Sequence, residues 1–473
     1  MRLERLFYKK KQEGRIIMST QKTHHLTHDL AEYAVSAENA ALTANDIQMA
    51  LLSTLDWTGA AISGKDEECV KKVASLMKSE GASGNCVLIA QNERLSSLAA
   101  ALINGTESHA LDFDDIHDFL SLHLTSPVLP AALAAAESVG ASGMRMLEAA
   151  VKGMHIMVAL SAGIMPEHYN LGRWHATGTI GVFGAAAAAG YLLGLSQSQM
   201  CNAFGIAAGL CSGIQLNFGT MAKPMCAGMA ARNGLMSAML AKNGFTGRAD
   251  IFDTDFLCNV SMKKDFSEII GKIEARLAAK PLGVHEVRFK RYPCGAPTHS
   301  GILNCKKILA ENSFRLDDIQ KIIFEPYPRA VRLVGEMHPQ TGLEGKFSIA
   351  FTAAAQMVFN KVTIETFTDE NVRDPRVVKL MNCMELVPND EFTPSRGGKT
   401  TIILKDGKSF TNSTYLLNHP ISLEETAPEV KDKYFEIADP RLGHSRAESL
   451  FKTVMELDKI SDIKKLDAVL QLS

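Results

Sequence analysis

The stretch from Ala176 to Ala222 contains no Asp, Glu, Lys, Arg or His over 47 residues, and His175 and Lys223 bound it. Ala and Gly dominate its first part, where a membrane span would carry Leu, Ile and Phe between aromatic or basic flanks. Small residues allow helices to pack closely, so the stretch predicts buried helices of a soluble protein. The segment 196–199, SQSQ, is typical of a capped junction between two such helices.

Composition limits the class of protein. A chain of 473 residues exceeds one ordinary hydrophobic core, so two domains are expected. Fifty basic against 52 acidic side chains give no overall attraction to nucleic acid or to a membrane surface. Nine cysteines stand far apart without a C-x-x-C pair, which favours reduced thiols in a cytoplasmic protein over a disulfide frame or a zinc site.

The N-terminus differs from the rest. Residues 1–17 carry six basic and two acidic side chains and lack the apolar core of a secretory signal. A weak amphipathic targeting segment and an extension upstream of a second start at Met18 are both open interpretations. We therefore assign residues 1–26 to an N-terminal extension without a functional role.

The pattern of the chain changes twice. Residues 27–283 read as successive Ala-rich helices, interrupted by Gly and Pro. Residues 284–420 contain alternating runs typical of strands, with helices between them: VHEVRFKRY, KIIFEPY and TTIILKDGKSFTNSTY, the last with an Asp-Gly hairpin turn. Residues 421–473 are charged, amphipathic and helical again. The sequence thus predicts a mainly α fold, in which a large all-helical domain built from both ends of the chain contains an inserted α+β lid domain.

Residues 109–123, HALDFDDIHDFLSLH, are the second dense group of polar side chains, after a helix expected to end near Asn104-Gly105. As a calcium loop the segment fails, because the glycine at the sixth position and the closing glutamate are missing. Asp114, Asp115 and Asp118 form a D-D-x-x-D pattern, with which helical terpenoid synthases hold diphosphate through a metal ion. The remaining interpretation is a loop for acid–base chemistry and carboxylate positioning.

Several segments in order carry a family resemblance. They are ALINGTESHALDFDD, VLPAALAAAE, RWHATGTIGVFGAAAAAGYLLGL, MAKPMCAGMAARNG, FKRYPCGAPTH and GLEGKFS. Over about residues 27–466 the chain resembles the MmgE/PrpD family, which contains 2-methylcitrate dehydratase, cis-aconitate decarboxylase and iminodisuccinate epimerase. The resemblance implies a large helical domain, a smaller α+β lid with the site between them, a homodimer, and action on small polycarboxylates without a metal or an organic cofactor.

The resemblance also implies site residues. The catalytic aspartate of the decarboxylase branch matches Asp112, and the histidine before V-L-P matches His123 after a shift of one position. The histidine of R-x-H-x-T-G-T matches His175, the lysine of x-K-P matches Lys223, and the lid lysine of F-K-R-Y-P matches Lys290.

Two positions depart from the family pattern. A threonine expected four residues after the aspartate is Ile116, and a lid tyrosine falls within 331–336, where no tyrosine occurs. These departures weaken cis-aconitate decarboxylation as the specific reaction, and His117 competes with His123 for one role. The further substrate-binding candidates are His117, Arg291, His299 and Lys346.

The residue types suit proton transfer beside a carboxylate. Histidine titrates near neutral pH, and a buried lysine beside apolar surface has a lowered pKa. His175, followed by Ala-Thr-Gly-Thr, is expected at a helix start, where the helix dipole favours the neutral imidazole. Lys223 precedes a proline, which places it at the end of a connection, and a lysine in so apolar a neighbourhood needs a partner or a task.

The sequence predicts a cofactor-independent lyase or isomerase of a small di- or tricarboxylate, with dehydration, decarboxylation and epimerisation left open. Lys223 and Lys290 would hold carboxylates, His175 and His123 would move protons, and Asp112 would orient a histidine. Two alternatives stay open: a metal-dependent diphosphate enzyme that uses the D-D-x-x-D aspartates, and a family member without catalytic activity.

Overall fold

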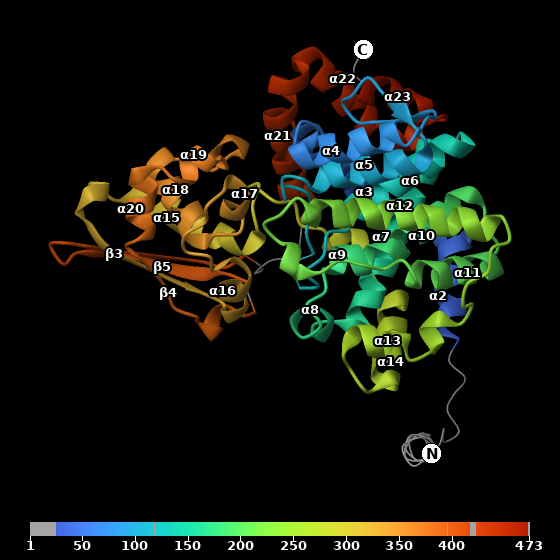
Figure 1. Cartoon of the computed structure of the whole chain (residues 1–473), viewed down its shortest axis with the longest axis horizontal. Helices are drawn as coiled ribbons and strands as arrows, with labels where there is room; N and C mark the ends of the chain where they lie inside the picture. Colours follow the sequence, from blue (N-terminus) through green and yellow to red (C-terminus); the bar gives the residue numbers. More distant parts are fainter. Residues whose placement is uncertain (1–24, 118, 395, 417–421, 472–473) are drawn as a thin grey trace.

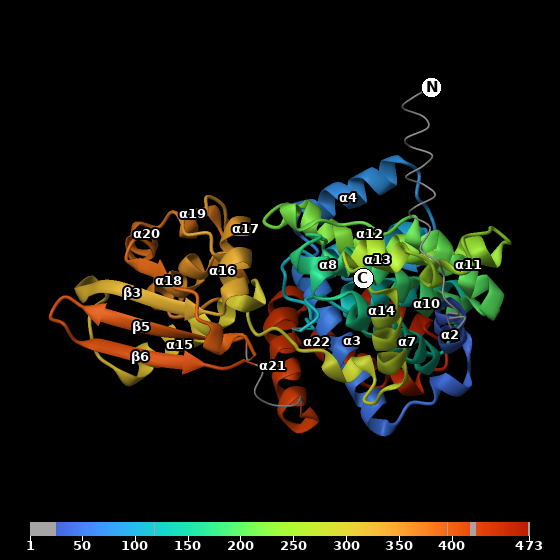
Figure 2. The same ribbon diagram turned by 90° about the horizontal axis from the view of Figure 1, so that it is seen from below.

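The computed structural model describes residues 25–117, 119–394, 396–416 and 422–471 (Figure 1). A large helical domain and a smaller α+β domain lie side by side, which confirms the predicted fold class (Figures 1 and 2). The predicted N-terminal extension up to residue 24, Asp118 and the predicted boundary at 420–421 lie outside the described residues.

The first part of the chain forms most of the larger domain. Its short antiparallel ribbon pairs β1 (Cys86–Val87) with β2 (Arg94–Leu95). Its helices are α2 (Leu26–Val35), α3 (Ala44–Gly64), α4 (Glu68–Ser79), α5 (Ser97–His109), α6 (Thr125–Val139), α7 (Gly143–Ile164), α8 (Glu167–Asn170), α9 (Ala176–Thr179), α10 (Gly181–Leu193), α11 (Gln197–Ala208), α12 (Ala222–Lys242), α13 (Phe256–Ser261) and α14 (Phe266–Ala278).

Glycines explain how the central helices approach one another. A Cβ atom at Gly105 of α5 would lie 2.8 Å from the Cα atom of Gly228 of α12, and one at Gly153 of α7 would lie 2.5 Å from the carbonyl oxygen of Gly184 of α10. Larger residues would force these helices apart.

Only the first part of the charge-free stretch is buried inside this packing, because residues 209–221 are partly or fully exposed, with Leu216 83% exposed. Two segments, Gly143–Ile164 and Ala176–Leu193, are long and apolar enough to cross a membrane by length and composition, yet 89% of the apolar window of each is buried against the rest of the domain. The predicted junction is also present, since Ser196 and Gln199 form a capping box at the start of α11.

The smaller domain is a four-stranded sheet with helices on one face (Figures 1 and 2). The strand order is β4-β3-β5-β6, with β3 parallel to β4 and antiparallel to β5, and the predicted Asp-Gly hairpin joins β5 to β6. Its own apolar core runs from Cys305 to Leu404. Its elements are α15 (His299–Glu311), β3 (Ile319–Pro326), α16 (Pro328–Val334), α17 (Gly342–Gly345), α18 (Ile349–Phe359), α19 (Asp369–Val372), α20 (Pro375–Met381), β4 (Met384–Leu386), β5 (Gly398–Leu404) and β6 (Ser409–Thr414).

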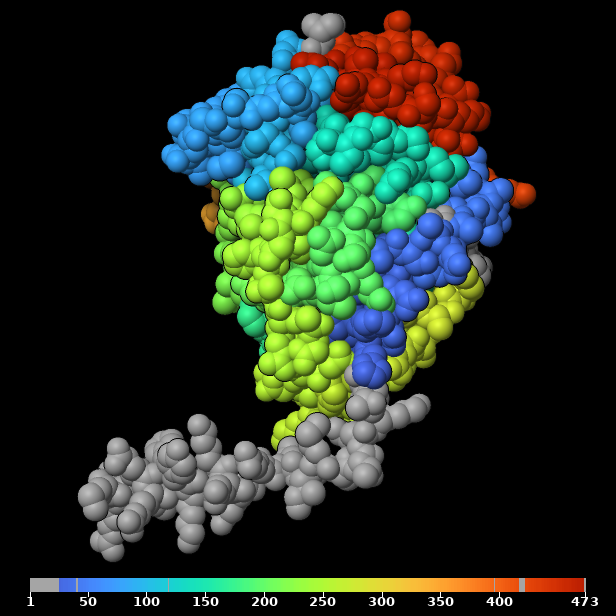
Figure 3. All heavy atoms as spheres, turned by 90° about the vertical axis from the view of Figure 1, so that its right-hand side faces the viewer, coloured from blue at the N-terminus to red at the C-terminus, as the bar shows by residue number. Residues whose placement is uncertain are grey.

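The C-terminal helices return to the helical domain. α21 (Leu423–Leu442), α22 (His444–Met455) and α23 (Lys464–Leu470) contribute to the same apolar core as the first part of the chain. In Figure 3 this segment, in red, lies against the blue and cyan segments of the domain. Lys433 of α21 makes the link polar as well, because its Nζ atom lies 2.6 Å from both Oδ1 of Asp56 in α3 and the carbonyl oxygen of Phe113.

Two expectations about local structure are wrong. Residues 284–292 form no strand: they begin in a 3₁₀ turn, and Arg288 makes a single two-hydrogen-bond bridge with Ile116. The helix expected to end near Asn104-Gly105 continues to His109. The Asn104 side chain bonds the backbone of Val87 and Ile89, so it stabilises the helix from outside instead of ending it.

Candidate active site

The loop that joins α5 to α6 carries the centre of the site. Asp112 has a φ of 54°, in the left-handed region that residues with a Cβ atom rarely adopt. The backbone bridge between Ile116 and Arg288 draws the segment after the helical domain toward this loop. Lys290 therefore reaches Asp112, although 178 positions separate them in the chain.

Asp112 holds two lysines. Nζ of Lys223 lies 2.5 Å from one carboxylate oxygen, and Nζ of Lys290 lies 2.8 Å from the other and 3.0 Å from the carbonyl oxygen of Asp112. All three side chains are buried. Burial alone would raise the pKa of Asp112, but the two ammonium groups hold it well below its usual range. The Asp112 carboxylate is thus shared between two buried ammonium groups.

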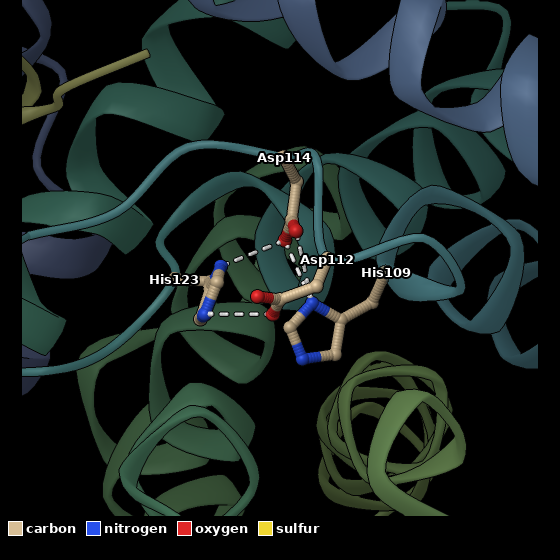
Figure 4. Close-up of side chains that lie close together, drawn as sticks. All are labelled: His109, Asp112, Asp114 and His123. Carbon is tan, nitrogen blue, oxygen red and sulfur yellow. Dashed lines mark hydrogen bonds and ion pairs between the residues drawn. The ribbon is translucent and has the colours of Figure 1, made fainter. Parts of the chain in front are cut away.

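A second carboxylate, that of Asp114, lies between two histidines next to Asp112 (Figure 4). Nδ1 of His109 lies 2.9 Å from the Asp114 carboxylate, Nδ1 of His123 lies 3.0 Å from it, and Oγ of Ser126 donates to it at 2.5 Å. Burial opposes ionisation of Asp114, but the two histidines lower its pKa well below the usual range. An ionised carboxylate only accepts, so His109 carries its hydrogen on Nδ1, whereas Nδ1 of His123 lies within ion-pair distance of the same carboxylate without an aligned hydrogen bond.

The remaining nitrogens then have defined roles. Nε2 of His109 accepts a hydrogen bond of 2.9 Å from Nζ of Lys223. Nε2 of His123 faces Asp112 at 3.9 Å, too far for a hydrogen bond, and is left as a base on the cavity side. The chain Lys223–His109–Asp114–His123 thus connects two of the predicted catalytic residues.

Burial keeps these histidines neutral. Burial is the largest effect on His109 and lowers its pKa to about 4. It also lowers the pKa of His123, although the charge of Asp114 opposes this shift. Burial and the positive charge of Lys223 lower the pKa of His175 well below its usual range. Burial lowers the pKa of Lys223 as well, with Asp112 opposing and Lys290 adding to the effect.

His175 and Lys223, the two ends of the charge-free run, meet at this site. His175 is the N-cap residue of the short helix α9, as expected, and its ring packs edge-on against Phe218 with 5.1 Å between centroids. Lys223 lies in the first turn of α12, with its ammonium group 5.6 Å from the Phe218 ring and 5.5 Å from the Phe347 ring. The apolar surface predicted around these groups is therefore partly aromatic.

A cavity lies between the two domains and contains all five predicted catalytic residues in its wall. Helical-domain residues make one wall, and Tyr327, Arg329 and Arg396 of the α+β domain belong to the other. The α+β domain thus covers the site in the manner of a lid. The five catalytic candidates of the lining are Asp112, His123, His175, Lys223 and Lys290.

The four predicted substrate-binding residues lie outside the wall of this cavity. His117 pairs with Glu286 at 2.7 Å. Arg291 is mostly exposed near Glu429, and His299 packs edge-on against Tyr292. Lys346 donates to the carbonyl oxygens of Leu111 and Pro293, so it braces the site loop from the lid side. All four residues therefore have local contacts outside the cavity.

Sequence reasoning missed several residues of the site. His109 was overlooked because its helix was expected to end earlier. Asp114 was weighed only as a metal ligand. The arginines and tyrosines of the cavity carry no local signal, because distant segments bring them together. The missed lining residues include Ser121, Tyr169, Tyr327, Arg329 and Arg396.

Asp114 and Asp115, the two described aspartates of the D-D-x-x-D pattern, do not share one site. Both oxygens of Asp115 accept hydrogen bonds at the start of α6, from the backbone of Leu124 and Thr125 and from the Thr125 hydroxyl, and burial raises its pKa to about 6. Among the described residues, His109, Asp112, Asp114 and His123 have ligand atoms within 4.8 Å of one another and could hold a metal ion. Two lysines and two histidines already contact those carboxylates, so a cation would have to displace them.

Comparison with known proteins fits this architecture. The MmgE/PrpD N-terminal domain model matches residues 28–267, and the MmgE/PrpD C-terminal domain model matches residues 292–459. The chain is 28% identical to human cis-aconitate decarboxylase over 91% of both chains, and 27% identical to cis-aconitate decarboxylase of Aspergillus terreus over 87% of both. It is 26% identical to the cis-aconitate decarboxylase-like protein oryM of Aspergillus oryzae, over 94% of this chain and 97% of that protein. By sequence and by domain organisation, the chain belongs to the MmgE/PrpD family.

Proposed function

We propose that this protein is a lyase that uses lysine and histidine acid–base chemistry, without a cofactor, to break a bond next to a carboxylate of a small di- or tricarboxylic acid. The observation that carries the proposal is the buried Lys223–Asp112–Lys290 cluster, in which one carboxylate faces two ammonium groups. The cavity wall contains the cationic side chains of Lys223, Lys290, Arg329 and Arg396 with the carboxylate of Asp112, and such a wall favours an anionic ligand. Family membership and the decarboxylase relatives support a lyase-type function on a carboxylate.

Decarboxylation of a substrate like cis-aconitate is the first candidate reaction. The bond between the leaving carboxylate and its carbon breaks, its electron pair forms a new double bond to the neighbouring carbon, and a proton is added to the far carbon of the original double bond. Carbon dioxide leaves uncharged, so a partly aromatic surface such as that of Phe218 and Phe347 favours its formation. The proton must come from a group beside the cavity.

We assign roles from the geometry. Lys223 and Lys290 hold one carboxylate of the substrate and stabilise the negative charge that develops. The lowered pKa of Lys223 also makes its ammonium group a suitable acid. His123, whose Nε2 is available, and His175 exchange protons with the substrate. His109 and Asp114 line no part of the cavity, and they act as positioning residues that connect Lys223 to His123.

Dehydration is the second candidate reaction. Ile116 lines the cavity where the decarboxylase branch is expected to carry a threonine hydroxyl, so one polar contact to the substrate is replaced by an apolar one. Loss of water needs a base that removes a proton from the carbon next to a carboxylate and an acid that protonates the leaving hydroxyl group, and the histidines and Lys223 supply both kinds of group. A cytoplasmic location and a homodimer remain predictions from the sequence.

An NMR experiment in heavy water tests the proposal. The protein is incubated with cis-aconitate, citrate and 2-methylcitrate, each with and without a chelator. We expect one substrate to lose carbon dioxide or water in both conditions, and deuterium to enter the product at one carbon if carbon dioxide is lost. Loss of all activity in the chelator would support a metal-dependent enzyme instead. If no polycarboxylate reacted or raised the melting temperature, the protein would be a non-catalytic member of the family.

A further inference from the structure

The lid wall of the cavity contains two arginines that the proposed chemistry does not use. Arg329 lies at the start of α16, and Arg396 lies just before β5. Both line the cavity. Among the residues that the structure describes, neither makes an ion pair with a carboxylate, in contrast to the lysines of the opposite wall.

Aromatic rings hold both guanidinium groups in place. Arg329 lies over the ring of Tyr169, with 4.5 Å from its Cζ atom to the centroid, and Arg396 lies over the ring of Tyr327 at 5.3 Å. Arg329 also donates from Nη2 to Oγ of Ser121 across the domain boundary. Stacking on a ring restricts the plane of a guanidinium group while its N–H groups at the edge remain able to donate.

Both arginines retain donors without an acceptor. Nε of Arg329 and Nε of Arg396 are buried from solvent, and neither has a hydrogen-bond partner within the described part of the chain. Burial lowers the pKa of Arg329, and the nearby charge of Arg396 adds to this effect. Two neighbouring half-buried guanidinium groups with shielded, unpaired Nε donors favour an anion, and a planar carboxylate matches the fork that each group presents.

We propose that Arg329 and Arg396 form a second carboxylate subsite on the lid wall, which binds a carboxylate of the substrate other than the one held by Lys223 and Lys290. The inference rests on the proposed function and deepens it, because it restricts the substrate to acids with at least two carboxylates. One carboxylate lies at Lys223 and Lys290, and another lies at the arginine pair. Binding of such a substrate draws the lid and the helical domain together.

The test measures binding of a series of unreactive acids by calorimetry at neutral pH. Tricarballylate carries three carboxylates, glutarate carries two and propanoate carries one. We expect Arg329→Gln and Arg396→Gln each to weaken tricarballylate binding roughly ten- to a hundredfold, as for a lost charge-assisted hydrogen bond, and to leave the weak binding of propanoate unchanged. Arg329→Lys keeps the charge but not the two-pronged guanidinium group, so its affinity for tricarballylate should lie between those of the unmodified protein and Arg329→Gln.

Two controls separate the subsite from a structural role. Arg332 lies on the same helix α16, bonds Asn170 and Gln215 of the helical domain and lines no part of the cavity, so Arg332→Gln should bind tricarballylate like the unmodified protein. Ser121→Ala removes the acceptor of the Arg329 contact across the domains but keeps the guanidinium group, and should cost much less affinity than Arg329→Gln.

The outcomes distinguish the two proposals. If the unmodified protein binds tricarballylate and the arginine variants bind it equally well, the subsite is wrong and the proposed function stands. Equal losses in Arg332→Gln and Arg329→Gln would also overturn the subsite, because they would assign both arginines to domain contacts. If the unmodified protein binds none of the three acids, the proposed function fails and the subsite fails with it.

Discussion

The two walls of the cavity treat charge differently. On the helical wall, Asp112 contacts two lysines, and Asp114 contacts two histidines. On the lid wall, Arg329 and Arg396 contact aromatic rings and no described carboxylate. Groups that move protons need a fixed pKa and a fixed tautomer, which such networks provide. Groups that recognise a substrate anion need open donors. The difference assigns chemistry to the helical wall and selection to the lid.

Loss of Lys223 should have the largest effect on activity. Lys223→Met removes the ammonium group that faces both Asp112 and His109, and we expect kcat to fall on the order of 10³-fold. Lys242→Met, at the exposed end of the same helix α12, is the matched control and should keep full activity. Steady-state kinetics measure both variants. An unchanged kcat in a folded Lys223→Met protein would remove the helical wall from the chemistry.

The positioning role of Asp114 gives the next effect. Asp114→Asn keeps the shape but removes the charge that holds Nδ1–H of His109 and lies 3.0 Å from Nδ1 of His123, so we expect kcat to fall on the order of 10²-fold with little change in KM. The pH profile of kcat should shift as well, because the histidines lose their carboxylate partner. A drop in thermal stability with an unchanged pH profile would indicate a structural role only.

The buried Lys433–Asp56 cluster, which contacts the site loop at Phe113, should contribute more to the free energy of unfolding than to catalysis. Lys433 contacts Asp56 and the Phe113 carbonyl in a buried cluster, and burial raises the pKa of Asp56 to about 6. Lys433→Met leaves a buried carboxylate without its partner and should reduce the free energy of unfolding by about 3–5 kcal/mol. Denaturant unfolding measures this loss. Adding Asp56→Asn to Lys433→Met should recover much of it, and no recovery would mean that the pair is not coupled.

The smallest effect concerns pH. Burial lowers the pKa of His155, in the helical domain outside the cavity, to about 4, while the unfolded chain binds its proton near pH 6.5. The unfolded state then binds more protons as pH falls, so His155 makes unfolding easier by up to about 3 kcal/mol between pH 6.5 and 4. We expect melting temperatures to fall over this window, and less steeply in His155→Gln. Equal slopes of melting temperature against pH in the two proteins would contradict the lowered pKa of His155. The lid arginines stay charged over this pH range and do not contribute to the slope.

The sequence predicts the architecture because its signals are local. Ala- and Gly-rich runs favour close helix packing, and the Asp-Gly turn marks the hairpin between β5 and β6. Motifs also bring Asp112, Lys223 and Lys290 to one site, as the structure places them. The strand predicted at 284–292 fails because one backbone bridge to Ile116 replaces a ladder.

The lid wall could not be predicted in the same way. Arg329 follows a strand and Arg396 precedes another, and nothing in either segment shows that they share a cavity with Tyr169 of the helical domain. His109 shows the other limit. Asn104 and Gly105 look like a helix end, but tertiary contacts continue the helix for one more turn. Long-range packing, which a local pattern does not record, decides both cases.

Separate measurement of kcat and KM, with whichever polycarboxylate reacts, tests the division of labour between the walls most directly. Asp114→Asn should lower kcat with KM nearly unchanged, whereas Arg329→Gln should raise KM roughly tenfold or more with a smaller change in kcat. The opposite pattern, with the lid arginine controlling kcat and Asp114 controlling KM, would contradict the account.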